Sequence, residues 1–435
     1  MFIVLSCHTD ERKELAEMTK HIVITGPNSL NAMLDMAIER GYSHVWVHPS
    51  SGIQYLEEQQ GNMLGEEWDS PLFNYQFKTG TKNNHLVSCY TRKVQDVRKS
   101  KPVLVTFLAY SPWGWKELPS GKVIEIIDHL ESRLGVPLGS PGMTGMKYVQ
   151  QIVCTYHPKW LVRPQANLSV FSFTQPLVWA REPTSEELSR KYVYYLDRNS
   201  SYPRVGVAEK FGVGEPVHYP NGCQFDKRLP GMWRIDIEYS PDLDERLPHP
   251  LYKMTCEWYP TPIVDLLIDK GCVFDIKEAI VFPQKEFVFK QSIENLWSMR
   301  SEYERGTAER DAFKNVMNSL VGSTSAGFDN WKNRPDWYVQ FVACARNVVY
   351  RNIGKIAEKD NKFPVIIMND ALLYLADEET PELALPSMAI RDNLGCYKLE
   401  FRMEVTDQVR SILTSDKIKS PGMKVHELKV LKGVN

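Results

Sequence analysis

Two apolar runs flank a polar pair in residues 363–379, FPVIIMNDALLYLADEE, and this stretch constrains the fold more than any other. Apolar segments on both sides of Asn369-Asp370 predict a β-hairpin with the polar pair at its tip. Because both runs are apolar, we expect the hairpin to be buried and the Asp370 carboxylate to face a cleft. An Asp at a tight hairpin tip is also common without any function, so a purely structural role stays open.

A second carboxylate follows another apolar strand. Tyr192–Leu196 is strand-like and leads directly into Asp197, after which the chain turns through Asn199, Ser200, Ser201 and Tyr202 to Pro203. Such a turn can offer backbone N–H groups to a phosphate while the carboxylate binds a divalent cation. The alternative is an Asx-type turn, in which Asp197 and Asn199 only join a strand to a loop.

Residues 310–322, RDAFKNVMNSLVG, have the periodicity of a helix with two distinct faces. The apolar face is formed by Phe313, Val316, Met317 and Leu320. Arg310, Lys314 and Asn318 fall at i, i+4 and i+8 on a separate polar stripe. Two cations one turn apart suit a triphosphate, and a solvated helix face is the alternative.

Residues 1–180 alternate between strand-like and helix-like patterns, which indicates a mixed sheet with helices packed on it. We predict strands at Phe2–Leu5, His21–Thr25, His44–His48 and Pro102–Tyr110, and helices at 30–38 and Val123–Leu134. Residues 50–100 are predicted to be long loops around one or two strands, and 135–145 to be turn-rich.

The second part of the chain has a different organisation. The polar segment 181–190 predicts a domain boundary, and residues 192–284 are turn-rich and strand-like. Helical blocks are predicted at about 288–321 and 340–359, followed by a hairpin at 364–376.

Charge and cysteine usage narrow the class of protein. With 52 Lys+Arg against 54 Asp+Glu the formal net charge is −2, so any basic groove for a nucleic acid has to be local. Eight cysteines without a CxxC pair predict neither a zinc site nor a disulfide scaffold. Without a long apolar segment the sequence predicts a soluble protein of a reducing, intracellular compartment.

Taken in order, the three polar sites resemble the polymerase module of family B DNA polymerases, most closely the short protein-primed type of bacteriophages and linear plasmids. The family pattern is Asp-x-x-Ser-Leu-Tyr-Pro, then Lys-x-x-x-Asn-Ser-x-Tyr-Gly, then Tyr-x-Asp-Thr-Asp-Ser. Here the first motif is Asp197 to Pro203, and the second is Lys314 to Gly322 with Val321 in place of the Tyr. Gly214-Glu215-Pro216, LGCYKLE (394–400) and LKGV (431–434) resemble further family segments.

The resemblance covers roughly residues 185–435 and implies a fold. We expect an α/β N-terminal domain, RNase H-like or exonuclease-like and degenerate, followed by an α+β polymerase palm with helical fingers. The expected domains are 1–185 (exonuclease-like), 186–284 (palm, first part), 285–339 (fingers helices) and 340–435 (palm, second part, with the thumb absent or minimal).

The resemblance also implies roles for single residues. Asp197 and Asp370 would be catalytic and would bind Mg²⁺ or Mn²⁺. Ser200 and Ser201 would lie near the triphosphate of a dNTP, and Tyr202 under its sugar as the gate against ribonucleotides. Lys314, with Arg310, would neutralise the phosphates, and Asn318 would line the nucleotide pocket. Lys417, Lys419 and Lys429, near Lys424 and Lys432, would contact the DNA backbone, with a solvated tail as the alternative.

Three departures from the family pattern bear on activity. At the third motif at most one carboxylate remains: Asp370 replaces the second Asp with Met368 at the first, or in the other register Asn369 and Ala371 replace both. We prefer the first register, because it keeps a metal ligand followed by a small and a hydrophobic residue. Asp10-Glu11 lacks the Asp-x-Glu spacing of the exonuclease, and no thumb follows the LKGV segment.

Three functions are therefore compared. The first is template-directed DNA synthesis in phage or mobile-element replication, in the bacterial host cytoplasm, on DNA and dNTP. The second is a catalytically inactive polymerase-like scaffold that binds DNA or a terminal protein or another replication protein. An RNase H-like nuclease acting through residues 1–180 ranks last, because that range has no acidic cluster.

Overall fold

The structure is a computed structural model. It describes residues 21–24, 39–40, 42–49, 68–69, 75–82, 85–93, 103–108, 111, 113–171, 176–240, 244–254, 257–325, 334–415 and 420–433. The chain divides into two compact units: unit 1 comprises Met1–Ile152 and Asn295–Ser323, and unit 2 comprises Val153–Glu294 and Thr324–Asn435. The exonuclease-like, palm and fingers ranges predicted from the sequence have other boundaries, and their assignment stays a prediction.

Unit 1 is built on a mixed six-stranded sheet of order β1-β2-β6-β5-β4-β3. The strands are β1 (His21–Ile24), β2 (His44–Val47), β3 (Trp68–Asp69), β4 (Tyr75–Lys82), β5 (His85–Lys93) and β6 (Val103–Phe107). β1, β2 and β6 run parallel, and the pairs from β6 to β3 are antiparallel. The predicted mixed sheet is confirmed. Residues 50–100 carry three strands rather than one or two, because a largely polar sequence can still pair in an antiparallel sheet.

The helices of unit 1 correct two predictions. They are α2 (Ser120–Leu134), the start of α3 (Pro141–Tyr156), the end of α7 (Lys290–Ser301), and α8 (Ala308–Ser323). The helical block predicted at 288–321 is two helices, separated by a turn in which Gly306 has φ +83°. The range 135–145, predicted to be turn-rich, contains the start of α3. Its glycines fit helix packing, since a Cβ at Gly145 would lie 3.0 Å from the Val316 carbonyl oxygen of α8.

Two predictions lie outside the described residues of unit 1: the strand Phe2–Leu5 and the helix at 30–38. The core that is described contains stacked indole rings, with Trp113 and Trp115 at a centroid distance of 4.7 Å and both tilted against Trp46. Helix α2 buries its apolar stripe, including Val123 and Leu130, as its periodicity predicts.

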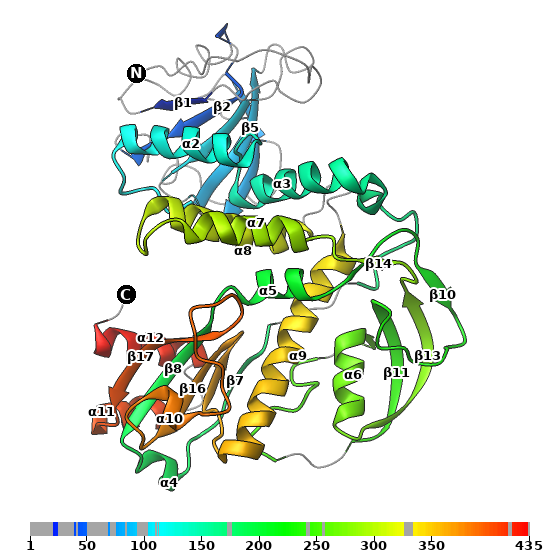
Figure 1. Ribbon diagram of the computed structural model, residues 1–435, viewed down its shortest axis with the longest axis vertical. Coiled ribbons are helices and arrows are strands. Elements are labelled where there is room, and N and C mark those ends of the chain that lie inside the picture. Colours follow the sequence, from blue (N-terminus) through cyan, green and yellow to red (C-terminus); the bar gives the residue numbers. More distant parts are fainter. Residues whose placement is uncertain are drawn as a thin grey trace. The chain divides into compact units, whose positions relative to one another are not determined.

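Unit 2 contains a five-stranded, fully antiparallel sheet of order β17-β8-β16-β15-β7 (Figure 1). The strands are β7 (Val178–Ala180), β8 (Tyr192–Arg198), β15 (Ile366–Met368), β16 (Ala371–Ala376) and β17 (Tyr397–Glu404). Both the predicted strand before Asp197 and the predicted hairpin around Asn369-Asp370 are present. The hairpin lies inside the sheet, because β16 pairs with β8 and β15 with β7.

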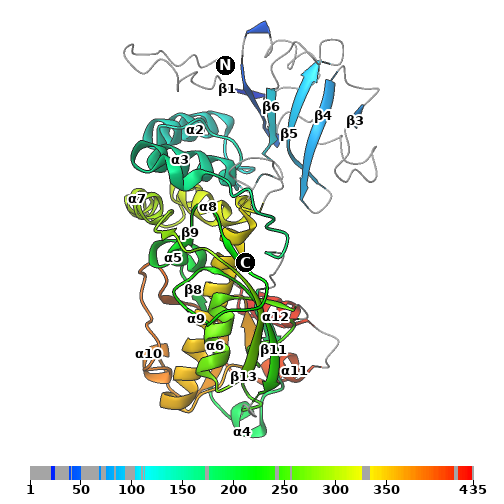
Figure 2. The ribbon, with the colours of Figure 1, turned by 90° about the vertical axis from the view of Figure 1, so that its right-hand side faces the viewer.

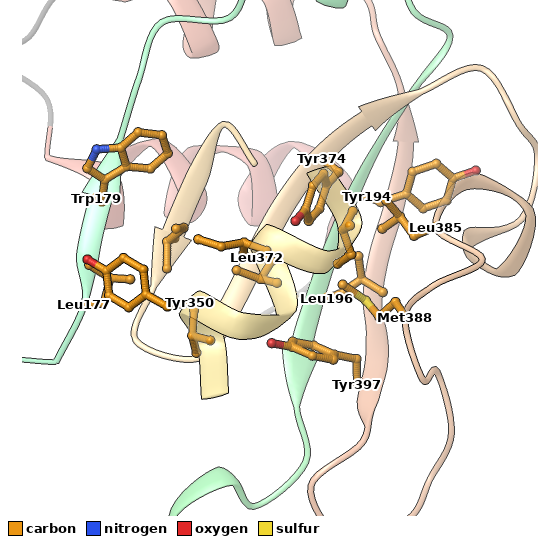
Figure 3. Close-up of a cluster of buried hydrophobic side chains, with 14 of the residues drawn as sticks. Leu177, Trp179, Tyr194, Leu196, Tyr350, Leu372, Tyr374, Leu385, Met388 and Tyr397 are labelled. Carbon is orange, nitrogen blue, oxygen red and sulfur yellow. The ribbon is translucent and has the colours of Figure 1, made fainter. Parts of the chain in front are cut away.

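Helices cover both faces of this sheet, which explains why β16 is buried at all six positions. On one face, the long helix α9 (Pro335–Asp360) packs Tyr350 and its apolar neighbours against Leu196, Leu372 and Tyr374 (Figure 3). On the other face, α11 (Asp407–Thr414) and α12 (Pro421–Lys432) cover Tyr195 and Leu373. Alternate residues of β8 and β16 therefore enter two different cores.

A second sheet of unit 2 packs on the same long helix. Its strands, of order β10-β13-β11-β12, are β10 (Val217–Tyr219), β11 (Gly231–Tyr239), β12 (Trp258–Pro260) and β13 (Val273–Val281). Helix α6 (Thr261–Asp269) lies against this sheet, and Val339 and Ala343 of α9 join the same core (Figure 2). The remaining elements are β9 (Phe211–Gly212), β14 (Lys285–Glu286), α4 (Ser185–Leu188), α5 (Ser201–Ala208), α10 (Pro381–Ala384) and a 3-10 helix at Pro158–Leu161.

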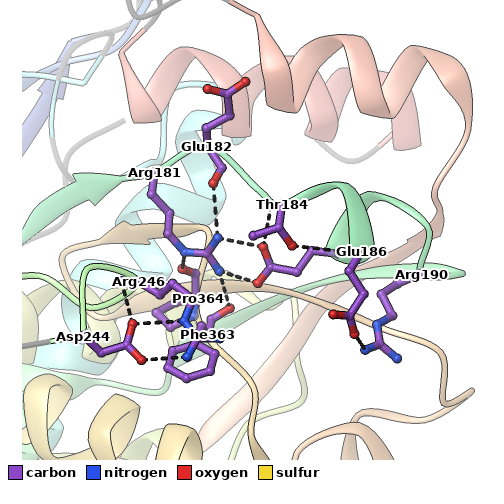
Figure 4. A network of polar contacts seen from close by, with 10 residues as sticks. Arg181, Glu182, Thr184, Glu186, Arg190, Asp244, Arg246, Phe363 and Pro364 are labelled. Atoms are coloured by element: carbon purple, nitrogen blue, oxygen red, sulfur yellow. Dashed lines mark hydrogen bonds and ion pairs between the residues drawn. The ribbon is translucent and has the colours of Figure 1, made fainter.

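A polar network fixes the chain just before β15 (Figure 4). The Arg181 guanidinium donates to the Pro364 carbonyl oxygen at 3.0 Å and to Glu187 at 2.7 Å. Glu187 also completes a capping box with Thr184 at the start of α4. The Arg246 guanidinium lies 3.5 Å from the centroid of the Phe363 ring. These contacts hold the hairpin in register by fixing the residues that lead into it.

Candidate functional site

Two carboxylates lie at one end of the inner strands of the five-stranded sheet. Leu196 of β8 pairs with Leu372 of β16, so Asp197 and the hairpin tip Asn369-Asp370 lie at the same ends of neighbouring strands. Asn369 takes the left-handed conformation, with φ +61°, that a two-residue hairpin loop requires. The fold therefore brings together the two acidic residues predicted as catalytic, which are far apart in the sequence.

Asp197 has a cation directly opposite it. β17 pairs with β8 so that Lys398 faces Asp197, and the Lys398 Nζ lies 3.2 Å from the Asp197 Oδ2. Lys398 also contacts Glu400 at 3.0 Å, and Glu400 in turn contacts Lys429 of α12 at 3.1 Å. Burial acts to lower the pKa of Lys398, but the hydrogen bond to Glu400 and the charge of Asp197 outweigh it, and the pKa is raised.

Asp370 is a carboxylate in an unfavourable environment for its charge. Burial, and then the negative charge of Asp197, raises the pKa of Asp370 to about 7. Its own backbone N–H, the nearby Arg198 and a hydrogen bond from Ser201 act in the opposite direction. The mutual influence of Asp197 and Asp370 is that of two carboxylates sharing one site.

The turn after β8 is fixed by the chain around residue 395. The Arg198 side chain, only 7% exposed, donates to the Gly395 carbonyl oxygen at 2.8 Å and to Ser201 Oγ at 3.0 Å. Asn199 donates from its side chain to the Asp392 carbonyl oxygen at 2.9 Å, so this contact ties the turn to the chain before β17. Ser200 has φ +50° and precedes helix α5.

Tyr202 lies in the first turn of α5, close enough to the hairpin tip to respond to its charge. Burial, and then the charge of Asp370, raises the pKa of Tyr202. Asp197, Asp370, Ser201 and Tyr202 thus form one cluster at the end of the sheet, with Arg198 beneath it. This cluster is called the palm-edge site below, after the palm domain predicted from the sequence and its place at the ends of β8 and β16.

The second predicted set lies on helix α8 of unit 1. Its apolar stripe is fully buried, as predicted, and Lys314 and Asn318 lie on the opposite, more exposed side. Neither the Lys314 ammonium nor the Asn318 amide has a hydrogen bond to another described residue. Arg310 is engaged, since its guanidinium donates to the Tyr303 carbonyl oxygen at 2.7 Å and closes the turn before α8.

The predicted DNA-contacting lysines fall into three groups. Lys417 and Lys419 lie outside the described residues. Lys429 is half-buried and ion-paired with Glu400, and Lys432 is on the exposed last turn of α12. Lys424 is only 9% exposed and donates to the Leu413 carbonyl oxygen at 2.8 Å, so it joins α12 to α11 and is not available to a DNA backbone. Helix α12 packs on the sheet through Val425 and Leu428, and for Lys417 and Lys419 the choice between DNA contact and a solvated tail stays a prediction.

Residues 177–334 match the family model of DNA polymerase type B, organellar and viral. This range contains the Asp197 motif, the Lys314 motif and the segment between them. Within residues 177–334, about a third of the chain, the sequence is therefore similar to type B DNA polymerases. The resemblance that the sequence motifs indicate is thereby confirmed for this range.

A similar fold is found among solved structures. Phi29 DNA polymerase complexed with primer-template DNA matches with a TM-score of 0.58 and 13% sequence identity, over 87% of this chain and 78% of that one. Phi29 DNA polymerase complexed with primer-template DNA and incoming nucleotide matches with a TM-score of 0.56, also at 13% identity, over 87% and 79%. At this identity the similarity shows a polymerase-like fold alone. Comparison with curated protein sequences found no match.

The site contains two charged residues whose place beside the carboxylates was not predicted from the sequence. Among the described residues no group of three or more His, Cys, Asp or Glu side chains is placed to hold a metal ion. Instead, Lys398 and Arg198 lie against the two carboxylates. Both residues lie in segments that the sequence analysis singled out, Arg198 in the first motif and Lys398 in LGCYKLE. The sequence does not contain the strand register that places Lys398 opposite Asp197. Among the described residues no helix is long and apolar enough to cross a membrane.

Proposed function

We propose that this protein is a template-directed DNA polymerase whose palm-edge site transfers nucleotides with the help of divalent cations. The observation that carries the proposal is the placement of Asp197 and Asp370 at the same end of two neighbouring strands, where the charge of Asp197 helps to raise the pKa of Asp370. The type B family match over residues 177–334 supports DNA synthesis as the reaction.

The donor set of the palm-edge site fits Mg²⁺ or Mn²⁺. Mg²⁺ in proteins is commonly held by one or two carboxylates together with the phosphates of a substrate, and needs no larger protein cage. The raised pKa of Asp370 is itself the mark of a buried carboxylate beside another, which a bound cation would stabilise in its charged form. When bound, such ions stabilise the attacking and leaving oxygens of an in-line displacement.

The chain's own residues would then position the substrates. Ser200 and Ser201 lie at the start of α5, beside the carboxylates, and we assign them to the triphosphate of the incoming dNTP. Tyr202 would lie under the sugar and exclude ribonucleotides. On α8, Lys314 and Arg310 would neutralise the phosphates and Asn318 would line the nucleotide pocket. Positioning and charge stabilisation supply most of the catalysis in phosphoryl transfer.

DNA and dNTP are the proposed ligands, in phage or mobile-element replication in a bacterial host cytoplasm. Support comes from the matched phi29 DNA polymerase structures, which are complexes with primer-template DNA and incoming nucleotide. Lys429 and Lys432, with Lys417 and Lys419, are the proposed contacts to the DNA backbone. A terminal protein or another replication protein is the proposed partner.

Primer extension tests the function. The wild-type protein is assayed with Mg²⁺ and then Mn²⁺, beside Asp197→Ala and Asp370→Ala, with Asp275→Ala as a control at an exposed carboxylate of β13. We expect extension by the wild type and the control, and loss in both site variants. Extension that persists in Asp197→Ala would place the chemistry elsewhere.

A second function, a polymerase-like scaffold that binds DNA or a replication protein without synthesis, is favoured by one observation. Lys398 already supplies a positive charge to Asp197 at 3.2 Å, which is the role of a metal ion in an active site. Under this reading, the wild type extends no primer with either metal but still retains primer-template DNA in a gel-shift assay.

A further inference from the structure

Unit 2 has a cavity away from the palm-edge site. It measures about 520 Å³ and is lined by the end of α5, by α6 and α9, and by the loops before β11 and after β14. Ligand pockets for small molecules span roughly 300–1,000 Å³, so one nucleotide-sized molecule fits this volume. None of the residues of the palm-edge site lines it.

The lining of the cavity has an excess of positive charge. Five cationic side chains face two carboxylates: Lys210, Lys227, Arg228, Lys285 and Arg351 against Glu209 and Asp265. The two arginines are already paired, Arg351 with Asp265 at 2.8 Å and Arg228 with Asp226 at 2.8 Å. The three lysines have no carboxylate partner among the described residues.

Lys210 and Lys285 lie close enough for the charge of Lys210 to act on Lys285, and Lys227 directly precedes Arg228, which Lys285 contacts. The Lys285 ammonium donates to the Arg228 carbonyl oxygen, and burial together with the charges of Arg228 and Lys210 lowers its pKa. Like charges held this close repel, and an anion bound between them removes the repulsion while accepting charge-assisted hydrogen bonds. A phosphate group has the charge and the oxygen atoms for this place.

The floor of the cavity offers a hydrogen-bonding group. Gln340 of α9 is only 9% exposed, and its side chain lines the cavity. Two other polar side chains of the lining have hydrogen-bond partners: Asn347 donates to the Pro262 carbonyl oxygen at 2.8 Å, and Thr261 donates to the Leu229 carbonyl oxygen at 2.6 Å. The Gln340 amide lines the cavity and can both donate and accept a hydrogen bond, which suits the polar edge of a ligand.

An aromatic ring at the cavity wall gives the third part of the site. Phe287 is 38% exposed, and the Lys210 Nζ lies 5.2 Å from its ring centroid. An exposed ring bordered by a cation suits a nucleobase, because any of the bases can stack on an aromatic face.

We propose that this cavity is a nucleotide-binding site separate from the palm-edge site. The phosphates would lie among Lys210, Lys227 and Lys285, and the base would contact Phe287 and the Gln340 amide. The proposal does not depend on polymerase activity, because none of the residues it uses has a role in the proposed reaction.

Calorimetry in the presence of EDTA tests the proposal, since binding at a two-carboxylate metal site requires a divalent ion and this cavity does not. The probes are dATP, inorganic tripolyphosphate and a single-stranded oligonucleotide, titrated into the full chain. The charge variant is Lys210→Glu with Lys227→Glu, both exposed positions that leave folding intact. Its control is Lys355→Glu with Lys359→Glu, two exposed lysines of α9 outside the cavity lining.

We expect dATP to bind the wild type without metal, and the charge variant to bind it at least about tenfold more weakly, with the control unchanged. Gln340→Leu should weaken dATP binding and leave tripolyphosphate binding unchanged, because the amide contacts the base. No binding of dATP by the wild type would overturn the proposal. So would equal losses in the charge variant and its control, or binding of the oligonucleotide alone.

Discussion

Lys398 would lower the affinity of the palm-edge site for the proposed metal ion. It faces Asp197 across the β8–β17 pair, and a divalent cation has to compete with its ammonium for the same carboxylate. Lys429 belongs to the same ion-pair chain but contacts Glu400 and not Asp197. The two lysines therefore provide a matched comparison.

We predict that Lys398→Ala raises the affinity for Mn²⁺ several-fold, because it removes the competing charge at Asp197. Lys429→Ala should leave that affinity within about twofold, since Lys429 contacts Glu400 and makes no ion pair with Asp197. Electron paramagnetic resonance of free Mn²⁺ measures both. Lower affinity in Lys398→Ala than in the wild type would contradict the competition.

Asp370 makes stability depend on pH. Its pKa is about 7 in the folded chain, against an ordinary 3.8, so the folded state holds a proton that the unfolded state has already released. The stabilising contribution of the neutral carboxyl is complete below pH about 3.8 and is lost as the pH rises through about 7.

We therefore predict that Asp370→Asn is more stable than the wild type at pH 8, by roughly 1–4 kcal/mol, at about 1.4 kcal/mol per pKa unit. The difference should shrink towards pH 4. Urea unfolding without divalent ions, at pH 5 and pH 8, measures it. Parallel pH profiles for the two proteins would show that Asp370 has an ordinary pKa.

At the scale of elements, helix α9 starts with a buried ion pair that ties it to β9. Arg334 is fully buried and contacts Asp336 at 2.6 Å, the Gly212 carbonyl oxygen at 2.6 Å and the Trp337 ring at 4.0 Å. Gly212 has to be a glycine, because a Cβ there would lie 2.3 Å from the Phe282 ring. Helix α9 supports both sheets of unit 2, so this anchor affects the palm-edge site indirectly.

We predict that Asp336→Ala destabilises the protein by about 3–5 kcal/mol, because it leaves the Arg334 charge buried without a partner. Asp275→Ala, which breaks an exposed pair with Lys277, should cost less than about 1 kcal/mol. Urea unfolding compares the two. A small loss in Asp336→Ala would mean that water reaches Arg334.

The sequence predicted well those elements whose local pattern agrees with their burial. The strand before Asp197 and the hairpin around Asp370 are apolar throughout, and both are covered on two faces. The prediction was wrong where one residue type is typical of two structures. Gly142 and Gly145 were assigned to turns, but in the structure they lie in α3 and allow it to approach α8 closely. The Asp197–Lys398 contact depends on strand register, which no local pattern contains.

At the scale of the whole molecule, the near-neutral net charge of −2 fits a protein that uses local clusters of charge rather than a uniformly basic surface. Two such clusters lie in unit 2: the palm-edge site, where acidic and basic side chains alternate, and the cavity lined by unpaired lysines. The residues of the palm-edge site belong to motifs that can be recognised in the sequence. Nothing in the motifs indicates the second, whose lysines come from three separate segments and are assembled only by the fold.

Anomalous diffraction from crystals grown with Mn²⁺ and a dNTP tests the central claim most directly. The account predicts one Mn²⁺ peak within coordination distance, roughly 2.0–2.4 Å, of oxygens from both Asp197 and Asp370, with Lys398 displaced from Asp197. A site without a peak, with the Lys398 ammonium still bound to Asp197, would contradict it.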